Sequence, residues 1–184
     1  MKKLVPLLGL LVGATANAGP TLSPADTAQI DRSAAHLLSA GPDALTFVIV
    51  TEMPSERYVQ FAARGPVITF DFPVLGAVRP GVEGHRFDVD CSSLPPLRRA
   101  EEVESRYLSV EEESRLKAFL DKAGHRWEAK YCLTQSKDGQ RMGYNLYFVG
   151  RLAGPKAVAP FVQQVFREVY RLASIRSIEI ETDE

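Results

Sequence analysis

The stretch "SERYVQFAARGPVITFDF", Ser55–Phe72, predicts two antiparallel strands joined by a Gly-Pro turn, and this hairpin decides the fold. Successive side chains of a strand point to opposite faces of a sheet. Val59 and Phe61 therefore share one face of the first strand, and Tyr58 and Gln60 share the other. We expect the first pair to face helices and the second pair to lie on the more open side.

Apolar periodicity on either side of the hairpin predicts the remaining elements. In chain order these are a helix from Pro24 to about Leu38, strands at 45–51, 57–63 and 67–72, a long loop across Pro73–Pro96, a helix at 110–123, strands at 126–135 and 141–150, and one helix from Pro155, followed by a weak strand or a frayed tail at 177–182. The order α-β-β-β-(loop)-α-β-β-α indicates an α+β fold, with an antiparallel sheet of about five strands and helices on one face.

Two serines mark helix starts. Ser23 precedes Pro24, which suits the first helical position. Ser109 with Glu112 three residues later forms a capping box, and Gly124 supplies the expected stop of that helix.

Residues 1–18 have the features of a secretory signal peptide: two lysines, a short apolar run and an Ala-Asn-Ala end, with cleavage expected after Ala18. The apolar run is shorter than the ~20 residues that span a bilayer. A periplasmic or secreted chain is therefore expected, with one domain at 19–184 and a Pro/Gly-rich insertion at about 73–98. Without the two lysines the formal net charge changes from −1 to −3, which argues against nucleic-acid binding.

Cys91 and Cys132 are the only two cysteines. In an oxidising compartment an isolated pair most often forms a disulfide, and two buried thiols are the alternative. A Cys91–Cys132 bond would fasten the long loop to the first strand of the second hairpin.

Motifs for catalysis are missing from the sequence: it contains no nucleophile elbow, phosphate loop or dinucleotide fingerprint. "HRFDVDC" at 85–91 is the only candidate metal cluster, but an extended strand would direct its ligands to opposite faces. We therefore expect no metal, no cofactor and no catalytic residue. His125, which follows the helix-ending Gly124, is expected to be solvated.

Several short motifs resemble the TY-Chap/YbjN-like domains, which share a superfamily with class I type III secretion chaperones. The matching residues are the "YVQF" strand at 58–61, then Glu104, Tyr107 and Leu108 leading into the Ser-capped helix, and Gly124 followed closely by Trp127. The resemblance covers roughly residues 23–173, with the 73–96 loop as an insertion and two residues between Gly124 and Trp127.

The resemblance implies a small binding module that holds an extended polypeptide client or a second copy of itself. We therefore expect a non-enzymatic, exported protein-binding module, with Tyr58 and Gln60 as candidate partner-binding residues. Gln60 bonding to a neighbouring loop of its own chain is the alternative for that residue. The alternative for the whole chain is an enzyme or small-ligand binder that uses His85, Asp88 and Asp90 of the 85–91 loop.

Overall fold

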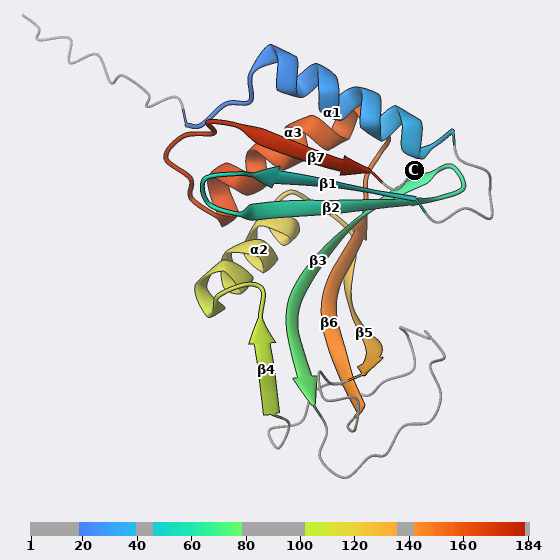
Figure 1. The fold of residues 1–184 in the computed structure, drawn as a ribbon, viewed down its shortest axis with the longest axis vertical. Coiled ribbons are helices and arrows are strands. Elements are labelled where there is room, and N and C mark those ends of the chain that lie inside the picture. Colours follow the sequence, from blue (N-terminus) through green and yellow to red (C-terminus); the bar gives the residue numbers. More distant parts are fainter. Residues whose placement is uncertain (1–18, 40–45, 79–101, 136–141, 183–184) are drawn as a thin grey trace, which may run out of the picture.

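One antiparallel sheet and three helices form the structure, a computed structural model that describes residues 19–39, 46–78, 102–135 and 142–182. The elements, labelled in Figure 1, are α1 (Pro24–Leu37), β1 (Thr46–Glu52), β2 (Arg57–Arg64), β3 (Val67–Val78), β4 (Glu102–Arg106), α2 (Val110–Lys122), β5 (Trp127–Gln135), β6 (Met142–Arg151), η1 (Pro155–Ala157), α3 (Val158–Gln164), η2 (Val165–Val169) and β7 (Ile178–Thr182). In the part of the chain so described, no helix is long and apolar enough to cross a membrane.

The sheet runs in the order β5-β6-β3-β2-β1-β7, with β4 pairing to β3 beside this path, and every pairing is antiparallel. The predicted α+β class and antiparallel sheet are confirmed. The prediction of about five strands was too low, because the sheet has seven. One added strand is β7, the segment expected to be a weak strand or a frayed tail, which pairs along β1.

The other added strand, β4, depends on an extension of β3. The prediction ended this strand at Phe72 and began a loop at Pro73, but β3 continues to Val78. Proline lacks the N–H that a regular ladder needs. The pairing with β6 accordingly shifts register between Pro73 and Leu75, and the strand continues beyond that bulge. Its far half pairs with β4, a segment that the sequence analysis did not predict as a strand.

The last helix, predicted as one element from Pro155, has three geometries. It begins as the 3₁₀ turn η1, continues as α3, and widens into the π-helical turn η2. Pro160 lies in the first turn of α3, where its missing N–H has no helical partner to lose. In the π turn the Tyr170 N–H donates to the carbonyl of Val165 at 3.1 Å, which places Tyr170 at the end of the element.

All three helices pack on one face of the sheet, as predicted (Figure 1). Val59 and Phe61 of β2 are completely buried there. Phe161 of α3 lies at the centre of the core, with its ring stacked on that of Phe70 at 4.8 Å between centroids. Burial of these aromatic rings makes the sheet–helix interface the main source of stability.

The close approach of β5, β6 and the core requires glycine at position 150. A methyl group there would contact the buried Phe70 ring and would lie 2.7 Å from the carbonyl oxygen of Arg126. We predict that Gly150→Ala lowers the free energy of unfolding by about 1–3 kcal/mol, measured by urea denaturation. In a double-mutant cycle, the shorter side chain of Phe70→Leu should make the combined loss smaller than the sum of the two single losses. Additive losses would contradict the proposed clash.

Candidate functional site

The face of the sheet opposite the helices, here called the open face, carries side chains that are only partly buried. Its members, assigned from strand alternation and register, are Phe47, Ile49, Thr51, Tyr58, Gln60, Thr69, Asp71, Lys130, Tyr147 and Val149. On β2, Tyr58 and Gln60 are half-buried where the adjacent Val59 and Phe61 are fully buried. The structure therefore agrees with the expectation that the Tyr58/Gln60 side is the more open one.

Gln60 lies near the middle of one row of residues that crosses six strands of the open face. Register places Gln60 between Ile49 of β1 and Asp71 of β3. Beyond Asp71 the row continues through Val149 of β6 to Glu128 of β5, and beyond Ile49 it ends at Glu181 of β7. Side chains directly opposite each other in antiparallel strands are close enough to interact. An amide and a carboxyl group therefore occupy the centre of the row, with aliphatic side chains on both sides of them.

Burial raises the pKa of the Asp71 carboxyl from 3.8 to about 6, and the charge of Lys130 offsets part of this effect. The carboxyl group consequently changes from a hydrogen-bond donor to an acceptor within a range close to neutral pH. An amide offers both a donor and an acceptor. Gln60 can therefore hydrogen-bond the opposite Asp71 carboxyl group whether that group is protonated or ionised.

Tyr58 is surrounded by other aromatic groups. Burial raises the pKa of its phenol, and the nearby phenols of Tyr107 and Tyr147 raise it further. A cavity of about 20 Å³ lies between Tyr58, Tyr107 and Pro73, among other residues. This volume holds roughly one water molecule, so it is too small for a substrate.

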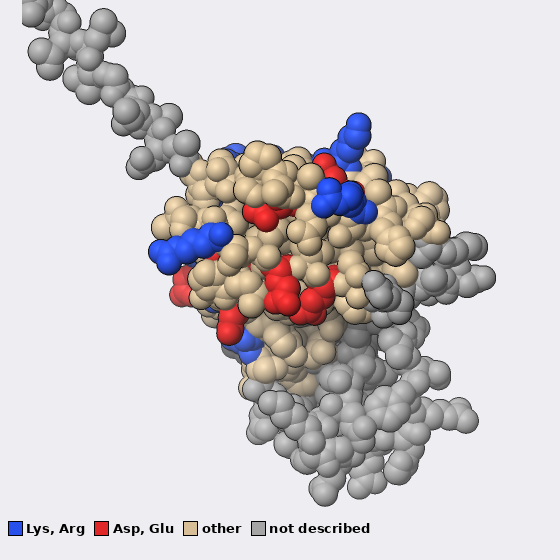
Figure 2. Space-filling model, turned by 45° about the horizontal axis from the view of Figure 1, so that its top comes forward, with Lys and Arg blue, Asp and Glu red and all other residues tan. Residues whose placement is uncertain are grey.

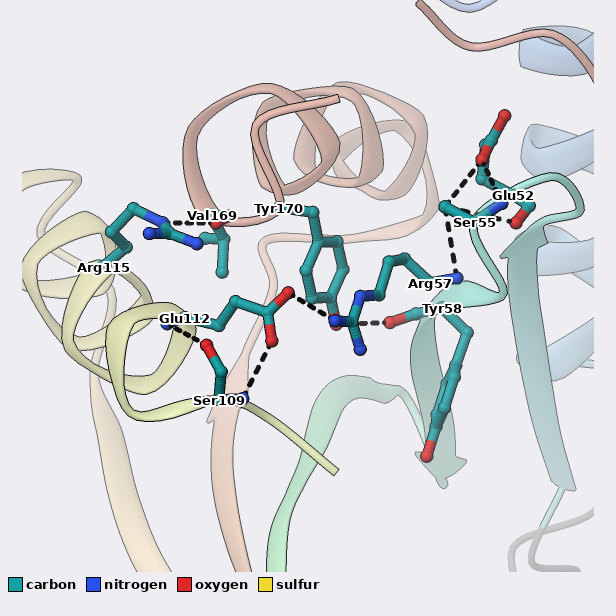
Figure 3. A network of polar contacts seen from close by, with 9 residues as sticks. All are labelled: Glu52, Ser55, Arg57, Tyr58, Ser109, Glu112, Arg115, Val169 and Tyr170. Carbon is teal, nitrogen blue, oxygen red and sulfur yellow. Dashed lines mark hydrogen bonds and ion pairs between the residues drawn. The ribbon is translucent and has the colours of Figure 1, made fainter. Parts of the chain in front are cut away.

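A chain of polar contacts holds β2 against the helices next to Tyr58 (Figure 3). The Tyr170 hydroxyl donates to the Tyr58 carbonyl at 2.8 Å, and the Arg57 guanidinium lies 5.7 Å from the centre of the Tyr170 ring. Arg57 Nη2 pairs with Glu112 Oε1 at 2.9 Å, and Glu112 Oε2 accepts the Ser109 N–H at 2.8 Å. The predicted capping box of α2 is therefore confirmed, and its glutamate also binds β2.

A second buried carboxylate fixes the turn before β2. Glu52 is 2% exposed, and its side chain accepts hydrogen bonds from the Ser55 N–H, the Ser55 hydroxyl and the Arg176 N–H at 3.0, 2.6 and 3.3 Å. The turn residue Glu56 has a positive φ of 56°, which is uncommon for a residue with a side chain. The entry of the chain into Arg57 and Tyr58 is thus set by contacts that the sequence did not reveal.

The residues named for the alternative site, His85, Asp88 and Asp90, all lie outside the described part of the chain, as does Cys91. Cys132 lies on β5 opposite Asn145 of β6, and the Cys91–Cys132 disulfide stays a prediction. Among the described residues, no group of three or more His, Cys, Asp or Glu side chains is arranged to hold a metal ion.

His125 is only partly solvated, where the sequence predicted a solvated side chain. Its ring is half-buried and lies 5.2 Å from the ring of Phe161 and 5.9 Å from that of Phe70, both nearly perpendicular to it. Gly124 turns the chain back toward the core with a φ of 70°, which places one side of the next side chain against Phe161 of α3.

Comparison with protein-family models, with curated proteins and with solved structures gave no match for this chain. The resemblance to TY-Chap/YbjN-like domains therefore stays a prediction from short motifs.

The Tyr170 hydroxyl should contribute measurably to stability, because its removal leaves the Tyr58 carbonyl without its side-chain donor. We predict that Tyr170→Phe lowers the free energy of unfolding by about 1–2 kcal/mol in chemical denaturation. Tyr107→Phe, at a side chain that is 39% exposed, is the matched control and should change it by less than about 0.5 kcal/mol. Equal effects of the two substitutions would show that the hydroxyl of Tyr170 has no special role.

Asp71 should make stability depend on pH. Because its pKa is raised in the folded protein, its protonated form is favoured there, and this stabilisation is lost as the pH rises through about 6. We predict that Asp71→Asn removes a fall in unfolding free energy of at most about 3 kcal/mol between about pH 4 and pH 7.5, measured by denaturation at several pH values. Glu128→Gln, in the same row but exposed, should leave that fall in place. A fall that persists in Asp71→Asn would contradict the assignment.

Proposed function

We propose that this chain is an exported, non-enzymatic polypeptide-binding module whose open face holds an extended segment of a client protein. The open face is the observation that carries the proposal. Within the described residues the helices lie on the other side of the sheet, and aromatic and aliphatic groups such as Tyr147, Val149 and Ile49 are left half-exposed. Contiguous half-exposed apolar groups on a folded domain mark interaction sites.

The chemistry of the row through Gln60 favours a polypeptide as the occupant. Gln60 and Asp71 offer a donor and acceptors that suit the N–H and C=O groups of an extended main chain. Tyr58 and Tyr147 add rigid, amphipathic rings that pack against varied side chains at little entropic cost. Six strands spaced at ~4.8 Å span about 24 Å, the length of roughly seven extended residues.

Charged side chains of both signs are visible on the molecule in the view of Figure 2, which brings the top of Figure 1 forward. Mixed charge of this kind is typical of a solvated surface that repels non-specific contacts. The non-enzymatic and exported parts of the proposal rest on the sequence, through its lack of a catalytic motif and its signal-peptide-like residues 1–18.

A photo-crosslinking residue at Gln60 tests the proposal in cells. Gln29, exposed on α1, is the matched control because it is the same residue type on the helical side. We expect one identifiable polypeptide of the cell envelope to be captured at position 60 and not at position 29. A synthetic segment of that polypeptide should then bind the purified protein, and Gln60→Arg should weaken binding at least about tenfold, whereas Gln29→Arg should not.

Three outcomes would contradict the proposal. Capture of a second copy of the chain at position 60 would identify the open face as a dimer interface. A crosslink within the same chain would show that the protein covers this face itself. Equal capture at positions 60 and 29, or none at either, would remove the open face as the binding surface.

A further inference from the structure

A cavity of about 550 Å³ opens at the end of the sheet where β5 begins and β6 ends. It is formed by the turn between α2 and β5, the link between β6 and η1, and one side of α3. Small-molecule pockets usually measure ~300–1,000 Å³, so the cavity is large enough for a ligand. None of the open-face residues lines it, and it is therefore a separate site.

The inner wall of the cavity is apolar and rigid. Phe161 lies behind it, 2% exposed and fixed by stacking on Phe70, and the apolar surface that remains open belongs to Ala153, Ala157 and Pro160. Three small lining residues, Gly124, Ala153 and Ala157, leave space in front of this wall. Gly124 is required there by its φ of 70°, so no side chain fills its place. A ligand with an apolar body would remove this wall from water.

His125 brings a neutral polar group to the cavity. Burial lowers the pKa of its imidazole, which keeps the ring uncharged at neutral pH. Among the described residues, the imidazole has no hydrogen-bond partner. Its nitrogens are also not among the fully buried side-chain atoms that lack a partner, since in that part of the chain only Asp31 Oδ1 is such an atom. The imidazole nitrogens are therefore not sealed from solvent, and His125 lines the cavity, where an imidazole N–H can donate a hydrogen bond.

Two guanidinium groups give the cavity a positive rim. Arg126 and Arg151 both line it and are exposed, and they lie next to each other just beyond the Trp127–Gly150 pair of β5 and β6. No aspartate or glutamate of the described chain lines the cavity. Guanidinium groups bind carboxylates through paired hydrogen bonds, so this rim selects an anion.

We propose that this cavity binds a small carboxylate with an apolar body. Arg126 and Arg151 hold the carboxylate at the rim, His125 donates a hydrogen bond to it, and the apolar body lies against Ala157 and Pro160. The site does not depend on the polypeptide-binding role of the open face, because the two share no residue.

Titration of the purified mature protein with 3-phenylpropionate tests this site, with 3-phenylpropionamide, propionate and inorganic phosphate as comparison probes. Backbone amide resonances of Gly124, Ala153 and Gly154 provide a local readout. We expect these resonances to move with 3-phenylpropionate. The amide should bind at least about tenfold more weakly because it lacks the charge, and propionate and phosphate should bind more weakly because they lack the aromatic body.

Variants separate the two halves of the site. Arg126→Gln and Arg151→Gln should each weaken binding of 3-phenylpropionate about tenfold, whereas Arg32→Gln, at an exposed position on α1, should leave it unchanged. Ala157→Phe fills the cavity without changing its charge and should abolish binding. No movement of the three resonances with 3-phenylpropionate would overturn the proposal. Equal binding of its amide would overturn the role of the arginines, and equal binding of phosphate would overturn the role of the apolar wall.

Discussion

The buried carboxylate of Glu112 is the contact on which the arrangement of helices and sheet depends. It accepts the Ser109 N–H at the start of α2 and pairs with Arg57 at the start of β2. Arg57 in turn lies over the ring of Tyr170, whose hydroxyl binds the Tyr58 carbonyl. A buried charge is costly unless it is paired, so one carboxylate requires α2, β2 and the end of the last helix to take these relative positions.

The sheet divides next to this contact, and the division creates the surroundings of Tyr58. β2 pairs with β3 only from Gln60 onward, because the far half of β3 leaves β2 and pairs with β4. The bulge at Pro73 marks the change. On the side that β3 leaves, no strand of the described chain pairs with the first residues of β2. Side chains from the helices hold these residues there. The Tyr170 hydroxyl replaces one main-chain contact of such a strand.

The two candidate sites use the same core from different sides. Phe161 and Phe70 stack between the sheet and α3, and Phe161 supports the exposed Pro160 and Ala157 side of the 550 Å³ cavity from behind. The open face lies on the opposite side of the same strands, with Gln60 and Asp71 at its centre. The aromatic packing between the cavity and the open face is rigid, because protein interiors are packed as densely as organic crystals, and it fixes the position of both surfaces.

Local signals in the sequence determined the class of fold, both N-terminal helix caps and the two faces of β2, because caps and strand alternation are set by residues a few positions apart. The extension of β3 beyond Pro73, the π turn before Tyr170 and the burial of His125 were decided by tertiary structure. Each depends on a partner distant in the sequence: β6 and β4 for Pro73, Tyr58 for Tyr170, and Phe70 with Phe161 for His125. Gln60 illustrates both levels, since alternation placed it on the open face and only the strand register placed it opposite Asp71.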